Sequence, residues 1–269
     1  MRTHLNPAPC TPGPGARALY LGTRDTKQVS CTAEALVVRN ERAQTLRYPL
    51  VRIARVVSST VVNWSGAALA LCLQSGIGIS WINAKGESLG TCYPHKRLQA
   101  TFAGALEQWL ENPTGPQNYQ NWLRARRMDV LVRWGQAAAN DTHATNATKV
   151  IDPGQWEHTK REWVYAREFR QHLPQAIHGH LMAYVGAQLA AHGAPPLLWD
   201  HHAEPVDLDA DLCQLLWAEM NLCTGTLADT TTTDKETIAL FERWIARNGA
   251  ALVLHLHSLH RTALKAGTE

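Results

Sequence analysis

The sequence lacks paired cysteines and long apolar runs. It contains six cysteines but no Cys-x-x-Cys pair and no regular cysteine spacing, which argues against a zinc finger and against a disulfide framework. We therefore expect a reducing, cytoplasmic location. Residues 1–15 are rich in proline and glycine and lack the apolar core of a signal peptide. The longest apolar stretch, residues 61–82, is broken by polar side chains and glycines, so no membrane span is expected.

A large net charge is also missing. The 26 Lys and Arg against 23 Asp and Glu leave +3, a balance that by itself does not predict a nucleic-acid-binding protein. The charges are nevertheless unevenly distributed. Residues 1–95 carry ten basic and four acidic side chains, residues 96–194 eleven and eight, and residues 195–269 five and eleven. The chain thus has a basic body suited to contact a polyanion and a late segment that gathers carboxylates.

The early part of the chain has the pattern of short strands. With 269 residues and 45 % hydrophobic positions, the sequence is long enough for one large or two modest cores. After a flexible N-terminus at 1–17, apolar stretches are separated by Gly, Asn and charged turns, which predicts a small antiparallel sheet within a β-rich domain at 18–95. The expected strands are 18–21, 28–31, 35–39, 44–48, 51–57, 77–82 and a last strand ending at 93. One helix is expected over 64–73, with Asn63 or Ser65 as its N-cap.

From residue 96 the pattern is helical, because apolar residues recur at steps of three and four. The predicted helices are 96–110, 119–138, 156–171, 175–191, 209–221, 235–247 and 250–264. The polar stretch 140–154 and the proline-containing stretch 194–207 are predicted to be loops. The fold class is therefore α+β, with an all-helical domain at 96–269 after the β-rich domain.

Four stretches resemble one known family. Residues 48–57 are similar to its Pro-Leu entry into a strand, and residues 67–90 to its helix, Gly-Ile strand and Gly-bearing turn. Residues 157–166 resemble a helix in which a Glu is followed by basic positions and then Tyr-Ala. Residues 201–216 resemble a His followed by an acidic helix. The family is the CRISPR spacer-acquisition integrase, the metal-dependent DNA nuclease and integrase subunit of the adaptation complex.

This resemblance implies an enzyme that inserts foreign DNA fragments, the spacers, into a CRISPR array. It implies that Glu157, His201 or His202, and Asp211 are catalytic metal ligands for Mg²⁺ or Mn²⁺. The implied partners are DNA, as protospacer and as CRISPR repeat, and a small ferredoxin-like adaptation nuclease, with no membrane involved. The β-rich domain is expected to form a homodimer, since pairing would remove a free sheet face or edge from water.

The sequence departs from the family pattern at three points. Leu198-Trp199-Asp200 stands where the family has a Gly and an aromatic before the His, Gln214 replaces the second acid of the helix, and the stretch 157–201 is short. These departures leave an alternative, a catalytically inactive relative that keeps the fold as a nucleic-acid-binding or structural dimer. An unrelated metal hydrolase acting on a small molecule is a further alternative.

The acidic stretch supports a metal on chemical grounds. Five acids and two histidines lie between 200 and 211, with no Lys or Arg before Lys235. Carboxylates are the ligands that Mg²⁺ prefers, and a His can complete a site that accepts Mn²⁺. The same residues also have ordinary explanations. Asp207 or Asp209 could cap a helix, Glu157 could be a first-turn acid favoured by the helix dipole, and the histidines could be solvated.

Arginines and tryptophans share the predicted helix 119–138. Trp122 and Trp134 stand at helical spacing and are expected, with Trp163, to pack in the helical core. Arginine binds phosphate well, so the arginines of this helix are the DNA-binding candidates. They are Arg124, Arg126, Arg127 and Arg133.

Overall fold

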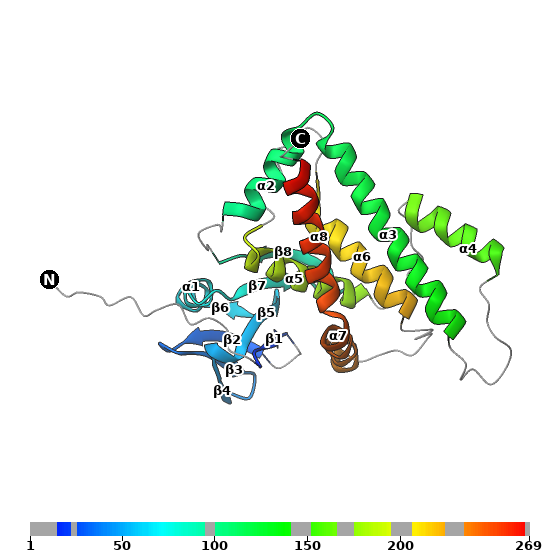
Figure 1. Ribbon diagram of the computed structural model, residues 1–269. Coiled ribbons are helices and arrows are strands. Elements are labelled where there is room, and N and C mark those ends of the chain that lie inside the picture. The colour runs from blue at the N-terminus through cyan, green and yellow to red at the C-terminus, as the bar shows by residue number, and fades with distance from the viewer. Residues whose placement is uncertain are drawn as a thin grey trace. The chain divides into compact units, whose positions relative to one another are not determined.

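The computed structural model describes residues 15–22, 26–94, 100–140, 152–165, 175–194, 206–223 and 234–266. Contacts divide the chain into two compact units. The first is formed within residues 1–99 and 178–196, and the second within residues 100–177 and 197–269. Strands occupy the blue and cyan part of the chain and helices the remainder, which confirms the α+β fold class (Figure 1).

The first unit contains two four-stranded sheets, in the orders β1-β5-β7-β8 and β4-β3-β2-β6. The expected strands and helix are confirmed to within a few residues. The elements are β1 (Arg17–Leu21), β2 (Thr26–Cys31), β3 (Ala35–Asn40), β4 (Thr45–Pro49), the 3₁₀ turn η1 (Leu50–Arg52), β5 (Ile53–Ser59), β6 (Asn63–Trp64), α1 (Gly66–Gln74), β7 (Gly78–Ile82) and β8 (Ser88–Cys92).

Both sheets are mixed, whereas the sequence predicted a single antiparallel sheet. β1, β5 and β7 run parallel, with Val56 of β5 opposite Leu19 on one side and Ile79 on the other. β8 is antiparallel to β7. The connections explain the difference. The β2–β4 strands lie between β1 and β5, and α1 lies between β5 and β7, so each connection is long enough to bring the chain back for a parallel strand.

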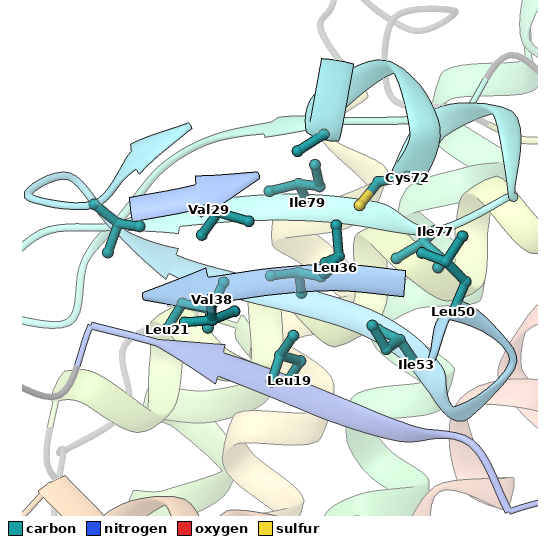
Figure 2. Packing of buried hydrophobic residues seen from close by; sticks show 13 residues of the cluster. Leu19, Leu21, Val29, Leu36, Val38, Leu50, Ile53, Cys72, Ile77 and Ile79 are labelled. Atoms are coloured by element: carbon teal, nitrogen blue, oxygen red, sulfur yellow. The ribbon is translucent and has the colours of Figure 1, made fainter. Parts of the chain in front are cut away.

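The two sheets and α1 share one hydrophobic core. Figure 2 shows side chains of β1, β2, β3, β5 and β7 in one cluster, with Cys72 of α1 at its border. Val29, Leu36 and Ile79 have no exposed surface. Ser65 is the N-cap of α1, as one of the two expected alternatives, because its Oγ accepts a hydrogen bond from the Ala68 N–H at 3.2 Å.

A helix from the later part of the chain completes this unit. From residue 178 onward, α5 (Gln175–Ala191) belongs to the first unit. His180 contacts Tyr20 of β1 edge-on, with ring centroids 5.1 Å apart. Gly179 lies so close to the carbonyl oxygen of Gly86 that a Cβ atom at position 179 would collide with it. The absence of a side chain at Gly179 therefore lets the helix approach the β7–β8 turn.

The second unit is helical. Its elements are α2 (Ala100–Glu111), α3 (Gly115–Asn140), α4 (Pro153–Lys160), the π-helical turn η2 (Arg161–Tyr165), α6 (Leu208–Cys223), α7 (Asp234–Asn248) and α8 (Ala250–Ala266). α3 packs on α6 and on η2, and α2 packs on α8. Trp122 and Trp163 are buried, as expected, while Trp134 is half-buried against Trp156. No helix in the described parts of the chain combines the length and the apolar character that crossing a bilayer requires.

Candidate metal site and nucleic-acid surface

Asp211 lies in the first turn of α6 and is buried, with 8 % of its surface exposed. The Tyr119 hydroxyl donates a hydrogen bond to Asp211 Oδ2 at 2.9 Å. Arg127 Nη2 lies 3.6 Å from Asp211 Oδ1. Both partners belong to α3, so two side chains of one long helix reach the two oxygens of this carboxylate.

The start of α6 concentrates further carboxylates. Asp207 is the N-cap, as one of the expected alternatives, because its Oδ1 accepts a hydrogen bond from the Ala210 N–H at 3.2 Å. Asp209 and Asp211 therefore stand in the first turn, where the helix dipole favours negative charge. Burial raises the pKa of Asp209 to about 7, and the hydrogen bond and charge of Asp207 act in the same direction.

Arg127 lies in the interior, with 2 % of its surface exposed. This position corrects the expectation that Arg127 faces DNA, since a buried guanidinium has no surface to offer to a phosphate backbone. Its guanidinium carbon lies 5.7 Å from the centroid of the Trp163 ring, and Trp163 Nε1 donates to the Arg127 carbonyl oxygen at 3.2 Å. The positive charge that the sequence does not provide near Asp211 thus comes from α3.

Tyr119 is enclosed by aromatic rings. It has no exposed surface, stacks on Trp122 with centroids 6.0 Å apart and meets Trp109 edge-on at 6.4 Å. Burial and the neighbouring charge of Asp211 raise the pKa of Tyr119 well above its usual value. The phenol therefore stays protonated and donates to the carboxylate.

Glu157 lies in the second turn of α4, which Asp152 caps by accepting a hydrogen bond from the Gln155 N–H at 3.2 Å. No acid occupies the first turn of α4, so the helix dipole does not account for Glu157. The side chain is 61 % exposed, and Lys160 Nζ lies 3.3 Å from its Oε1. Among the described residues, this carboxylate contacts Lys160 and not Asp211.

The predicted ligands His201 and His202 lie outside the described residues. Within the described ranges, no group of three or more His, Cys, Asp and Glu side chains is arranged to hold a metal ion. The structure therefore brings Asp211 together with Tyr119 and Arg127, and pairs Glu157 of α4 with Lys160.

The other predicted arginines of α3 are accessible to different degrees. Arg124 is exposed and donates to Asn121 Oδ1 at 3.2 Å. Arg126 is paired with Asp129 at 3.0 Å, and its side chain is 29 % exposed. Arg133 is 47 % exposed and pairs with the buried carboxylate of Glu219, whose pKa is raised by burial and lowered by Arg133, with burial the larger effect.

A groove of about 430 Å³ opens between α3 and α8 beside these arginines. It is lined by Arg126, Asp129, Val132, Arg133, Ala251, Leu254 and His255. Burial lowers the pKa of His255 to about 4, and the charges of Arg133 and Arg126 add to the effect. The imidazole is therefore neutral near pH 7.

Comparisons with known proteins identify a related family and a shared fold. Residues 19–128 match the sequence model of the family described as CRISPR associated protein Cas1. The solved structure of TM1797, a CAS1 protein from Thermotoga maritima, has 14 % identity and a TM-score of 0.64, over 93 % of this chain and 97 % of that chain. This chain therefore resembles the Cas1 family, in sequence over residues 19–128 and in fold along most of its length. No curated protein matches the sequence.

Two further solved structures share the fold of this chain. The chain in a TtCas1–DNA complex has 13 % identity and a TM-score of 0.57, over 93 % of this chain and 92 % of that chain. A casposase bound to an integration product has 10 % identity and a TM-score of 0.60, over 94 % and 91 %. At such identities these likenesses concern the fold alone.

Tyr119 is the residue at this site that sequence reasoning missed. Tyr119 and Arg127 are eight residues apart on one predicted helix, a spacing that places both on roughly the same side. That spacing is the available signal. The spacing indicates that Tyr119 and Arg127 lie on one face of the helix. It does not indicate that this face contacts Asp211.

Proposed function

We propose that this protein is a metal-dependent DNA endonuclease and integrase that inserts foreign DNA fragments into a CRISPR array. One observation carries the proposal: Asp211, the acid that the resemblance assigns as a metal ligand, is buried and contacted at both oxygens by Tyr119 and Arg127. The Cas1 family and the fold shared with a casposase bound to an integration product support the same reaction class.

By residue type, the proposed ligands are ones that bind Mg²⁺ or Mn²⁺. The proposed ligands are the carboxylates of Glu157 and Asp211 and an imidazole of His201 or His202, a set of hard oxygen donors with one nitrogen. Each carboxylate oxygen has two lone-pair directions, so Asp211 can accept its contacts from α3 and still coordinate a cation. The bound cation would stabilise charge on the scissile phosphate and orient a water or a 3′-hydroxyl for in-line attack.

The protein's own side chains would hold the substrate and the ligands. Tyr119 donates to Asp211 without neutralising it, which preserves a negative oxygen for coordination. Arg124 is exposed on α3, and Arg133, which pairs with Glu219, is 47 % exposed on the same helix; both side chains would contact DNA phosphates. Arg126 is half-accessible and would add to the same surface.

The proposed partners follow from the family. DNA is the substrate, and the similar fold of TtCas1 in its DNA complex supports this. A Cas1-containing chain in a Cas6–RT–Cas1–Cas2 complex also shares the fold, with 12 % identity and a TM-score of 0.53 over 95 % of this chain and 35 % of that one. This supports a partner of the Cas2 kind, and we propose that it is the small ferredoxin-like nuclease. A homodimer through the β-rich unit would cover exposed apolar side chains such as Leu46 of β4 or Leu89 of β8.

Nicking or disintegration of a branched DNA in Mg²⁺ or Mn²⁺ tests the proposal. We expect the Glu157→Gln plus Asp211→Asn double variant to lose the activity, because the change removes two ligand charges while keeping side-chain size. A Glu107→Gln plus Glu111→Gln variant changes the net charge equally on exposed positions of α2 and should remain active. If the first variant cleaves as fast as the unmodified protein, the assigned site is wrong.

A second candidate function is a non-catalytic relative that binds DNA. Two observations favour it: Arg127 already balances the charge of Asp211, and Glu157 is paired with Lys160 at the surface. Gln214 at the position of the second acid agrees with it. This candidate predicts DNA binding that weakens steeply with salt, without metal-dependent turnover. Reproducible cleavage that depends on Asp211 would exclude it.

A further inference from the structure

We propose that the groove between α3 and α8 binds one nucleotide, with its phosphate at Arg126 and Arg133 and its base on Leu254. The nucleotide is either a free mononucleotide or an unpaired nucleotide of a DNA strand, since both present the same groups to the groove. The inference goes beyond the proposed function because it requires neither a metal ion nor cleavage. Only its DNA-strand form rests on the DNA binding proposed above.

The size of the groove suits a small ligand. Its volume of about 430 Å³ lies within the range of small-molecule sites. α8 contributes Ala251, Leu254 and His255, which span about one helical turn, or ~6 Å. A docked peptide helix places its apolar anchors over about two turns, so this strip is too short to hold one.

The groove has a positive potential. Arg126 and Arg133 line it, and after burial their charges are the causes that lower the pKa of His255 in the same groove. Asp129 also lines the groove and pairs with Arg126 at 3.0 Å, but its side chain is 51 % exposed. An exposed ion pair of this kind is weak, so an arriving phosphate competes with it at little cost.

Both arginines retain donors for a phosphate. Within the described residues, Arg133 uses Nη1 for Glu219 and Nε for the Asp129 carbonyl oxygen, and Arg126 uses Nη1 for Asp129. A guanidinium carries five N–H donors in a planar fork that matches the geometry of a phosphate. The Nη2 groups of the two side chains therefore remain to donate to one.

The groove also contains apolar side chains and a polar atom without a partner. Leu254 is 67 % exposed and Val132 40 %, although burial of such side chains is favourable. His255 is 6 % exposed, and its Nε2 has no hydrogen-bond partner among the described residues, which is unfavourable for a buried nitrogen. A nucleobase supplies both complements, because it has a flat face for the apolar side chains and an edge of hydrogen-bond donors and acceptors.

Calorimetric titration of the full chain with dAMP in EDTA tests the inference without metal and without activity. We expect Leu254→Asp to weaken dAMP binding by about tenfold or more, because a carboxylate at this position repels the phosphate and replaces the apolar face. Leu264→Asp adds the same charge at a 49 % exposed position of α8 outside the groove and should bind like the unmodified protein. Arg126→Gln is a second variant and should also bind more weakly.

The ligands separate the two sources of the nucleotide. Deoxyadenosine lacks the phosphate and should bind more weakly than dAMP. If a single-stranded oligo-dA displaces dAMP and the oligo-dA·oligo-dT duplex does not, the groove takes an unpaired nucleotide of a strand. If neither displaces it, the groove takes free nucleotide.

Three results would overturn the inference. They are the absence of saturable dAMP binding, equal binding of dAMP and deoxyadenosine, and unchanged dAMP binding by both Leu254→Asp and Arg126→Gln. Because the titration contains no metal, none of these results bears on the proposed cleavage. A protein that nicks branched DNA but fails this titration would refute the nucleotide site alone.

Discussion

At the scale of single residues, Arg127 and Asp211 form an ion pair that is almost entirely buried. Their side chains are 3 % and 12 % exposed, so water does not replace a missing partner. Removing one member of a buried ion pair leaves the other charge unsolvated, which costs more than the pair itself contributes.

We therefore predict that Arg127→Met lowers the free energy of unfolding by about 3–5 kcal/mol. The control is Lys160→Met, which breaks the surface pair with Glu157 and should cost less than about 1 kcal/mol. Urea denaturation followed by circular dichroism measures both. Equal losses for the two variants would contradict the assignment of Arg127 to the interior.

Buried histidines give the second prediction at this scale. His255 is 6 % exposed, and its pKa is lowered to about 4 by burial and then by Arg133 and Arg126. The unfolded chain, with an ordinary histidine pKa near 6.5, binds the proton more readily than the folded protein. The contribution of neutral His255 to the free energy of unfolding is therefore fully present above about pH 6.5 and is lost as the pH falls toward 4.

His255→Leu should flatten the dependence of thermal stability on pH between 6.5 and 4, by up to about 3 kcal/mol across that interval. His257→Leu, an exposed position on the same helix, should leave the slope unchanged. Melting temperatures measured across the interval distinguish the two variants. A slope that persists in His255→Leu would place the acid sensitivity elsewhere, for example at His180, whose pKa is also lowered to about 4 by burial and by Arg55.

At the scale of elements, the sequence predicts what depends on local order and fails where distant segments meet. The helix expected over 250–264 is observed as Ala250–Ala266, since apolar spacing is a local property. The parallel pairing of β1 with β5 was not predicted, because alternation within a strand carries no information on its neighbour's direction.

In the candidate site, too, the sequence identifies individual residues but not the contacts between distant ones. Asp211 could be found from its place in an acidic stretch, and Asp207 could be recognised as a possible cap. The hydrogen bond from Tyr119 to Asp211 joins residues 92 positions apart. The sequence around Tyr119 and the sequence around Asp211 do not predict that the two residues meet. The expectation that no nearby Lys or Arg balances the acids failed because Arg127 is near in space and distant in sequence.

The approach of α5 to the β7–β8 turn gives a prediction about an element. A Cβ atom at Gly179 would collide with the carbonyl oxygen of Gly86, so Gly179→Ala should displace the helix and cost about 1–3 kcal/mol. Gly104 of α2 has open space around the same position, and Gly104→Ala should instead stabilise its helix by up to about 1 kcal/mol. Thermal denaturation of both variants measures the difference, and stabilisation by Gly179→Ala would contradict the close approach.

At the scale of the whole molecule, the uneven charge distribution has a partial internal explanation. Residues 195–269 carry eleven acids, and two of them, Asp211 and Glu219, are paired with Arg127 and Arg133 of α3. Part of the polarity along the sequence is therefore cancelled inside the second unit. Fewer positive side chains are therefore available to bind a polyanion than the sequence alone indicates. Arg124 is an exposed cation of α3, and its hydrogen-bonded neighbour, Asn121, is neutral.

DNA binding should accordingly depend on Arg124. We predict that Arg124→Gln weakens binding to DNA of any sequence and reduces the slope of log K against log salt by about 1, as expected for the loss of one phosphate contact. Arg243→Gln, on the exposed surface of α7, is the matched control and should keep the slope. Fluorescence anisotropy across a salt series provides the measurement. An unchanged slope for Arg124→Gln would remove α3 from the DNA surface.

The first unit draws on two separated stretches of the chain, residues 1–99 and 178–196. During synthesis its sheets emerge first and must wait for α5 until the ribosome has passed residue 196. A fragment ending near residue 95 would present a sheet in which Tyr20 and the Gly86 turn have lost the helix that covers them. Splitting this protein into separately expressed halves is therefore expected to yield an aggregating amino-terminal piece rather than an isolated domain.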